Sequence, residues 1–258
     1  MIATPERIFR LDGKLALVTG ASSGLGQHFV SVLAAAGARV ALAARRVDKL
    51  QTMVNDLVAS GIEARAFAMD VSDATSVAQA FDAISAWGTP DIVVNNAGVT
   101  VTKPALAQTE QDYDQVLDTN LKGCWLVATE AARRMVAAKQ PGSIINVASI
   151  LGERVAGGVA PYAISKAGVV QTTKALALEL ARYCIRVNAL LPGYVVTDLN
   201  RDFLTSDAGE KLKARIPSRR FGEMSDLDGP LLLLASDAGA AMSGSLIAVD
   251  GAHLVSSL

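Results

Sequence analysis

The stretch "KLALVTGASSGLG", residues 14–26, joins a run of apolar residues to three closely spaced glycines. The segment "KLALVT" (14–19) predicts a short buried strand, and the residues after the glycines predict a helix. Gly20, Gly24 and Gly26 allow a tight turn and the close approach of a phosphate group. The N-terminus of the following helix offers free N–H groups to such an anion. The stretch therefore predicts a phosphate-binding turn.

Strand-like and helix-like segments alternate along the rest of the chain. Further strands are expected at residues 38–44, 63–69, 91–98, 142–149, 185–193 and 245–251. Because these segments are apolar at successive positions, both faces of their sheet should be covered. The pattern predicts an α/β fold, a Rossmann-type doubly wound parallel sheet of about seven strands with helices on both faces. No linker interrupts it, so residues 1–258 are expected to form a single NAD(P)-binding domain, with a substrate loop or lid at about 196–228.

Composition and charge narrow the classes of function. The chain has 258 residues and a net charge of −1, so nucleic acid and acidic membrane surfaces are not expected partners. Two cysteines are too few for a disulfide framework and are typical of a reduced, cytoplasmic protein. No signal peptide precedes the first strand, and no apolar run is long enough to span a membrane. Two histidines exclude a histidine-rich metal site, and we expect no metal.

The end of the second predicted strand, "LAARR", bears on the choice of cofactor. In a dinucleotide-binding fold, a carboxylate at this place binds the ribose 2′-hydroxyl, whereas an arginine suits a 2′-phosphate. Ala44 is followed here by Arg45 and Arg46, without an acidic residue. A guanidinium can hold a phosphate through two parallel hydrogen bonds. The strand end therefore favours NADP(H), with NAD(H) as the alternative.

The glycine turn also admits a second interpretation. "GASSG" (20–24) matches the G-x-S-x-G pattern of serine hydrolases, with Ser22 as nucleophile and Asp250 and His253 as later partners. The pattern would follow the very first strand, where no earlier strand can supply an oxyanion loop. We therefore favour the phosphate-binding interpretation.

The segment "YAISK" (162–166) places a tyrosine and a lysine four positions apart at the start of a predicted helix. Positions i and i+4 lie on one face of a helix, so Tyr162 and Lys166 should point the same way. A nearby positive charge lowers the pKa of a phenol, and such a phenol can exchange a proton with a substrate oxygen. The alternative is a tyrosine stacked over a lysine stem on the surface.

Several motifs in this order resemble the short-chain dehydrogenase/reductase family. "TGASSGLG" (19–26) matches the family's T-G-x-x-x-G-x-G turn, and "NNAG" (95–98) matches the motif after its fourth strand. "YAISK" matches Y-x-x-x-K, with Ser149 thirteen positions before the tyrosine, and "LPGYVVT" (191–197) matches the family's Pro-Gly segment. The resemblance extends over nearly the whole chain, from about residue 11 to residue 251. It is nearest to β-ketoacyl and carbonyl reductases.

The resemblance implies a catalytic role for four residues. Tyr162 would be the acid/base that exchanges a proton with the substrate oxygen, and Ser149 would hydrogen-bond the same oxygen. Lys166 would lower the pKa of Tyr162 and hold the nicotinamide ribose. Asn120, in "DTNLKG", would help to hold a water that relays protons through Lys166.

A larger set of residues would line the cofactor. By resemblance these are Gly20, Ser22, Ser23, Gly24, Leu25, Gly26, Arg45, Arg46, Asp70, Val71, Asn95, Ala97, Gly98, Tyr162, Lys166, Pro192, Gly193, Val195 and Thr197. The chain departs from the family at Ser23, where many relatives carry a basic residue that helps to hold a 2′-phosphate. It also has Gly251–Ala252 where a glycine pair is more usual.

The resemblance implies an oxidoreductase that interconverts a ketone and a secondary alcohol of small-molecule size. A 3-oxoacyl-type or general carbonyl reductase is the first expectation, and a sugar-acid or polyol dehydrogenase is the alternative. A cofactor-sensing protein without catalytic activity would have no need for all four catalytic residues. Two long predicted helices, about 111–139 and 162–182, carry apolar stripes, and by resemblance such helices pair between subunits. A homotetramer is expected.

Overall fold

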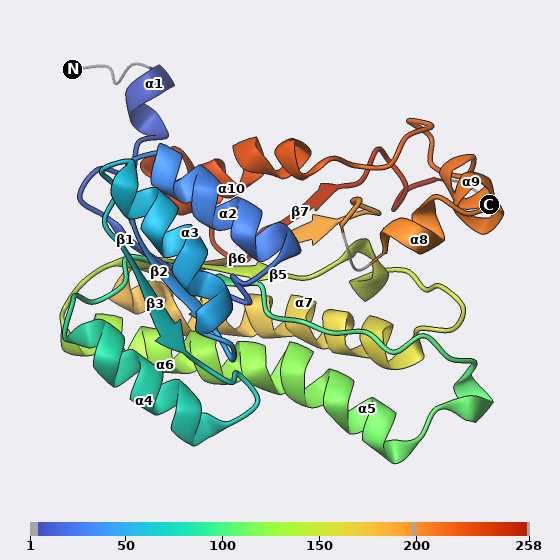
Figure 1. The fold of residues 1–258 in the computed structure, drawn as a ribbon, viewed down its shortest axis with the longest axis horizontal. Coiled ribbons are helices and arrows are strands. Elements are labelled where there is room, and N and C mark those ends of the chain that lie inside the picture. Colours follow the sequence, from blue (N-terminus) through green and yellow to red (C-terminus); the bar gives the residue numbers. More distant parts are fainter. Residues whose placement is uncertain (1–4, 198–199, 257–258) are drawn as a thin grey trace.

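Seven apolar segments form one parallel sheet in the part of the chain that the computed structural model describes, residues 5–197 and 200–256 (Figure 1). The strand order is β3-β2-β1-β4-β5-β6-β7. The strands are β1 (Leu15–Thr19), β2 (Arg39–Ala44), β3 (Ala64–Ala68), β4 (Ile92–Asn95), β5 (Gly142–Val147), β6 (Ile185–Pro192) and β7 (Leu246–Val249). The predicted doubly wound parallel sheet is confirmed.

Helices cover both faces of this sheet, and a separate apolar core lies under each layer (Figure 1). One layer holds α2 (Gly24–Ala35), α3 (Asp48–Ala59) and α10 (Asp228–Ala235), and the other holds α4 (Ala74–Ser85), α6 (Gly123–Ala137) and α7 (Ala160–Leu180). Phe29 anchors the first core and Phe81 the second, both with no exposed surface. Among the described residues, none of the helices is long and apolar enough to cross a membrane.

Two regions differ from the sequence-based prediction. The segment 196–228, expected to be irregular, contains α8 (Arg201–Leu204) and α9 (Asp207–Lys213), and a 3₁₀ turn then leads into α10. The sequence "DGPLLLLA" of α10 has apolar residues on every side, so its periodicity did not reveal a helix. The helix predicted at 111–139 is α5 (Glu110–Leu117) and α6, joined by a π-helical turn, Asp118–Lys122. A short α1 (Pro5–Ile8) precedes the sheet.

The strand order reverses between β1 and β4, and the loops after these two strands are tied together. The hydroxyl oxygen of Thr19 accepts hydrogen bonds from the backbone N–H groups of Asn96 (3.1 Å) and Ala97 (3.2 Å). The Asn96 amide donates to the Thr19 carbonyl oxygen at 3.0 Å. In open α/β sheets, ligands bind outside the carboxyl ends of the strands at such a reversal. The fold thus places the glycine turn and the "NNAG" loop on one site.

The packing of the two loops requires glycine at position 26. A Cβ atom there would collide with the carbonyl oxygen of Gly20 and would lie 2.5 Å from the Asn96 amide nitrogen. We predict that Gly26→Ala destabilises the protein by about 1–3 kcal/mol through overpacking, which lowers the melting temperature by roughly 2–10 °C. Gly229→Ala is the matched control, because no atom lies within 4 Å of its Cβ position in α10. Equal melting temperatures for the two variants would contradict this.

Candidate active site

The glycine turn has the geometry of an anion-binding cradle. Gly20 and Gly24 have φ angles of 64° and 54°, a left-handed conformation that favours glycine. Helix α2 begins at Gly24, and the side chain of its N-cap, Ser23, makes no capping hydrogen bond. Leu25 is half-buried behind the turn. The backbone N–H groups at this helix start are therefore arranged to bind a phosphate.

The loop after β6 forms the opposite wall of this cradle. The Thr197 side chain lies 3.9 Å from the position of a Cβ atom on Gly24. Asn200 fixes this loop, because its Oδ1 accepts from the Thr197 N–H (2.8 Å) and its Nδ2 donates to the Val195 carbonyl oxygen (2.9 Å). Sequence reasoning missed Asn200. The only available signal was an asparagine three positions after a loop threonine, a spacing typical of local side-chain to backbone hydrogen bonds.

Gly193 follows Pro192, the last residue of β6, and a contact that the sequence did not reveal requires glycine there. A Cβ atom on Gly193 would lie 2.8 Å from the Cβ atom of Asp250, so glycine is required by the close approach of β7. Val195 is buried in the core beside α10 and forms an isolated bridge with Gly222. These residues shape the nicotinamide side of the predicted site mainly through the backbone.

Two arginines follow β2 at the edge of the cradle. Arg45 and Arg46 are exposed, and among the described residues neither forms a hydrogen bond or an ion pair. The Arg45 charge lies near Asp70, the residue that follows the loop end of β3. Both guanidinium groups are thus free to bind an anionic group at the strand end, where the 2′-phosphate of NADP(H) is expected. This donor set fits NADP(H).

Asp70 and Val71, predicted to lie near the adenine, have structural contacts of their own. The Asp70 carboxylate accepts hydrogen bonds from the N–H (3.0 Å) and the hydroxyl (2.7 Å) of Ser72. Burial acts to raise the pKa of Asp70, but these hydrogen bonds and the Arg45 charge lower it below its ordinary value. Val71 is buried and packs on Gly123, where a Cβ atom would lie 2.7 Å from the valine side chain.

Asn95, predicted to line the cofactor, points into the protein interior. Its Nδ2 donates to Asn146 Oδ1 (2.9 Å) and to the Cys124 carbonyl oxygen (3.3 Å). The Cys124 thiol also donates to Asn146 Oδ1 (3.3 Å), and Asn146 donates in turn to the hydroxyl of Thr173 (2.9 Å). This buried network ties β4 and β5 to α6 and α7. The exposed Gly98 and the half-buried Ala97 are the parts of the loop that face outward.

Lys166 is a buried ammonium group at the centre of the site. Only 5% of its surface is exposed, and its Nζ donates to the carbonyl oxygen of Val147 at 2.7 Å. Burial lowers the pKa of Lys166 to about 8, while the nearby Cys124 thiol acts in the opposite direction. The ammonium lies 5.6 Å from the centre of the Tyr162 ring. The predicted pairing of the tyrosine and the lysine on one face of α7 is confirmed, with Lys166 buried and Tyr162 half-buried.

Tyr162 and Ser149 form the second part of this constellation. Ser149 follows β5, and its hydroxyl accepts from the Leu151 N–H (3.1 Å) and is hydrogen-bonded to Tyr162. Burial raises the pKa of the Tyr162 phenol, and the hydrogen bond with Ser149 only partly opposes this shift. Besides burial, the groups that act on this pKa are Ser149 and Tyr194, so the pKa of Tyr162 in the protein alone is set mainly by desolvation, and the role expected of Lys166 stays a prediction.

Asn120 lies in the π-helical turn between α5 and α6 and is 1% exposed. Its Oδ1 accepts from the Val99 N–H (2.8 Å), and its Nδ2 donates to the Val99 carbonyl oxygen (2.9 Å) and to the Ser165 hydroxyl (3.0 Å). A Cβ atom on Gly98 would lie 3.3 Å from Asn120 Oδ1 and 3.7 Å from Lys166 Nζ. The structure thus brings Asn120 beside Lys166, as the sequence predicted.

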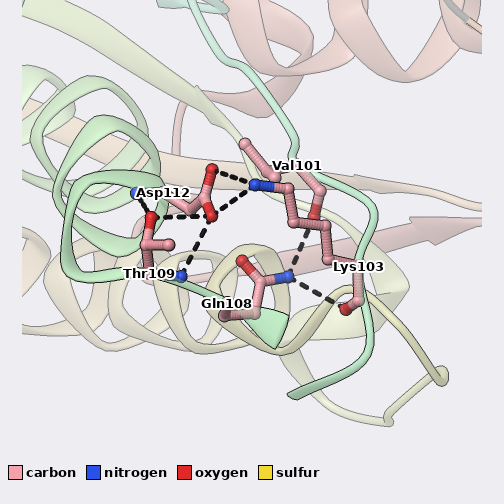
Figure 2. Close-up of polar contacts among 5 residues, drawn as sticks. All are labelled: Val101, Lys103, Gln108, Thr109 and Asp112. Atoms are coloured by element: carbon pink, nitrogen blue, oxygen red, sulfur yellow. Dashed lines mark hydrogen bonds and ion pairs between the residues drawn. The ribbon is translucent and has the colours of Figure 1, made fainter. Parts of the chain in front are cut away.

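A polar cluster shapes the loop that leads from Gly98 to α5 (Figure 2). Lys103 pairs with the Asp112 carboxylate at 2.6 Å, and Thr109 donates to the same carboxylate (Figure 2). The hydrogen bond from Lys103, followed by those from Thr109, lowers the pKa of Asp112 to about 2. The Gln108 amide donates to the Lys103 carbonyl oxygen at 3.0 Å, and the Lys103 N–H donates to the Gly158 carbonyl oxygen at 2.9 Å. These contacts hold the loop against the segment that precedes Tyr162.

The alternative triad of a serine hydrolase is not assembled. The Asp250 carboxylate accepts hydrogen bonds from the backbone N–H groups of Ala252 (3.0 Å) and Leu254 (2.6 Å). His253 Nδ1 is buried without a hydrogen-bond partner among the described residues, and the ring packs on Tyr194. Ser22 is in the glycine turn and forms no hydrogen bond with His253. The hydrolase interpretation is therefore rejected.

Comparison with known proteins extends over almost the whole chain. The sequence model of a family described as enoyl-(acyl carrier protein) reductase matches residues 20–252. The 3-oxoacyl-(acyl-carrier-protein) reductase FabG of Staphylococcus aureus is 38% identical over 240 residues, which cover 92% of this chain and 97% of that protein. D-threitol dehydrogenase of Mycolicibacterium smegmatis is 38% identical over 248 residues, which cover 96% and 95% of the two chains.

A solved structure supports the same relationship. The crystal structure of a gluconate 5-dehydrogenase from Burkholderia cenocepacia, in complex with NADP and tartrate, superposes with a TM-score of 0.95 at 35% identity. The match covers 98% of this chain and 100% of that one.

Proposed function

The chain belongs to the short-chain dehydrogenase/reductase family, and we propose on this basis that Tyr162 is the acid/base of its reaction. The enzyme is an oxidoreductase acting on CH–OH and C=O groups, as its relatives are. The observation that carries the proposal is the gathering of the buried Asn120, Ser149 and Lys166 with the half-buried Tyr162 at the carboxyl ends of β4 and β5.

The residues of this cluster have different roles in ketone reduction. Bound NADPH supplies the hydride, and the protein supplies orientation and a proton. Tyr162, whose pKa is raised by burial, stays protonated near neutral pH and donates its proton to the carbonyl oxygen as the alkoxide forms. Ser149 orients the same oxygen through its hydroxyl. Lys166 supplies a positive charge beside the phenol, and Asn120 holds the neighbouring loop through Val99.

The substrate is proposed to be a 3-oxoacyl compound or another small ketone, with sugar acids and polyols as the alternative class. Relatives of both kinds resemble this chain to the same degree, at 38% identity. The segment 196–228 follows β6 at the end of the sheet where the site lies and would form the substrate loop (Figure 1). We also propose a cytoplasmic location, which is supported by two free cysteines, Cys124 and Cys184.

The assignment of Tyr162 is tested by removing its hydroxyl. Tyr162→Phe keeps the ring and its packing, so NADPH should bind normally while ketone reduction falls by roughly 10²- to 10⁴-fold. NADPH oxidation with a panel of ketones measures the rate, and NADPH fluorescence measures binding. Tyr183→Phe, which removes an exposed hydroxyl far from the cluster, is the matched control. Near-normal turnover by Tyr162→Phe would exclude the mechanism.

We propose that NADP(H) is the preferred cofactor. Ala44 is buried at the end of β2. It has no carboxylate that could bind the ribose hydroxyls or repel a 2′-phosphate. Arg45 and Arg46 follow with free guanidinium groups, and Ser22 and Ser23 lie on the glycine turn nearby. The gluconate 5-dehydrogenase structure with bound NADP supports this choice.

One double substitution should reverse the preference. A charge-assisted hydrogen bond to the 2′-phosphate contributes roughly 1.5–3 kcal/mol, which is about a ten- to hundredfold preference. The wild type should favour NADPH over NADH in kcat/KM by at least that ratio. Ala44→Asp combined with Arg45→Ile should favour NADH, mainly through the KM for the cofactor. Equal use of both cofactors by the wild type would show that Arg45 is only a solvated residue.

We further propose a homotetramer, built by pairing of α6 and α7 between subunits. Trp125 and Val136 on α6 are 46% and 36% exposed, and their spacing puts them within about 20° on one helical face. Ile164 and Leu178 on α7 are 50% and 82% exposed, and their spacing puts them within about 40° on one face of that helix. Apolar side chains exposed together in this manner are typical of obligate interfaces.

This assembly predicts a change in mass on substitution of Leu178. Leu178→Arg should convert the tetramer into smaller species, because it would bury a charge without a partner in the interface. Light scattering at micromolar concentration and physiological salt measures the mass. The exposed Val58→Arg on α3 is the control, since that helix is on the other face of the sheet. A monomeric wild type would contradict the proposal.

A further inference from the structure

Tyr194 occupies a position beside the catalytic cluster that the mechanism above does not use. It follows Gly193 at the carboxyl end of β6, and β6 pairs with β5 in the register Val147 opposite Leu190. Ser149 follows β5 as Tyr194 follows β6, so both residues lie at the same edge of the sheet. The Tyr194 phenol is close enough to Tyr162 to act on its pKa. Tyr194 therefore lies at the same edge of the sheet as the catalytic cluster.

The ring of Tyr194 is held in place, but its hydroxyl is not engaged. The Tyr194 carbonyl oxygen accepts from the Gly222 N–H at 2.8 Å, and the His253 ring packs on the phenol with 5.8 Å between ring centres. Within the described chain, the Tyr194 hydroxyl has no hydrogen bond, although the residue is half-buried. Half-buried phenols usually have a polar partner. A fixed ring with a free hydroxyl is the arrangement expected of a group that binds a ligand.

A positive charge lies near this hydroxyl. Burial raises the pKa of Tyr194 and the charge of Arg154 only partly opposes this shift, so the hydroxyl stays protonated and can donate a hydrogen bond. Arg154 is itself fixed, because it donates to the His253 carbonyl oxygen and to the Ser256 hydroxyl. Tyr194 also lines a cavity of about 160 Å³, whose wall combines polar residues such as Ser218 and Asp250 with the apolar Ile216 and Val249. A substrate that carries an oxygen can use the free Tyr194 hydroxyl, which an alkyl chain would leave without a partner.

From this geometry, and resting on the proposed function, we propose that Tyr194 positions the substrate by a hydrogen bond to a second oxygen beside the reacting carbonyl. The substrate class is then a hydroxy ketone and the matching diol or polyol, not a plain ketone or an acyl thioester. Tyr162 and Ser149 bind the carbonyl oxygen, and Tyr194 binds the neighbouring hydroxyl from the β6 side. Tyr194 is a specificity-determining residue that takes no part in proton transfer.

The test compares two ketones that differ by one hydroxyl, butanone and 1-hydroxybutan-2-one, with NADPH as the reductant. The wild type should prefer the hydroxy ketone in kcat/KM. Tyr194→Phe should lower kcat/KM for 1-hydroxybutan-2-one by roughly 10- to 100-fold, mostly through KM, and should leave butanone within about twofold. Tyr183→Phe is the control and should change neither substrate. Acetoacetyl-CoA, the acyl thioester, should be a poorer substrate than the hydroxy ketone and should be insensitive to Tyr194→Phe.

Each other outcome has a defined meaning. An equal loss for both ketones would show that Tyr194 acts through packing or through the pKa of Tyr162, and it would overturn the proposal. No loss for the hydroxy ketone, or a wild-type preference for acetoacetyl-CoA, would overturn it as well. Failure of the proposed function would look different from failure of the Tyr194 proposal. In that case the wild type would oxidise NADPH with none of the three substrates, or Tyr162→Phe would remain fully active.

Discussion

The site depends on a single constraint, the burial of the Lys166 ammonium group. A buried charge must be hydrogen-bonded, and one bond goes to the carbonyl oxygen of Val147 at the end of β5. Gly98 lies close to this ammonium and closer still to Asn120 Oδ1, and Asn120 fixes the loop that carries this glycine through its hydrogen bond with Val99. Several elements therefore surround one nitrogen atom, namely the ends of β4 and β5, the π-helical turn and α7.

Burial also determines the protonation state in which the protein alone holds the Tyr162 phenol. Desolvation disfavours the charged form of each group, so it lowers the pKa of Lys166 and raises the pKa of Tyr162. A protonated phenol is a proton donor, which is the form needed for ketone reduction. Alcohol oxidation needs the phenolate, and it therefore requires either a higher pH or additional positive charge beside the ring. The sequence pairing of Tyr162 with Lys166 suggested the charge effect but contained no information on desolvation.

Most of the fold could be predicted, and the candidate catalytic residues could be located, because their signals are local. The apolar strands, the glycines at 20, 24 and 26, and the i, i+4 spacing on α7 are each contained in a short stretch. What was missed depends on segments distant in the sequence. Gly193 is required by Asp250, the Asn95 amide points to Asn146 and not to the cofactor side, and the all-round apolar α10 is a helix because its faces meet the sheet and α2.

The C-terminal turn is a place where contacts between residues distant in the sequence affect the substrate side of the site. Ala252, which stands where the family more often has glycine, has a φ angle of 70°. This left-handed conformation is strained for alanine, and the turn is held by the Asp250 carboxylate and by Arg154. The same turn carries His253, whose ring fixes Tyr194. The proposed specificity on this side thus depends on residues about 60 positions apart, whereas Ser149, Tyr162 and Lys166 lie within 18 positions of one another.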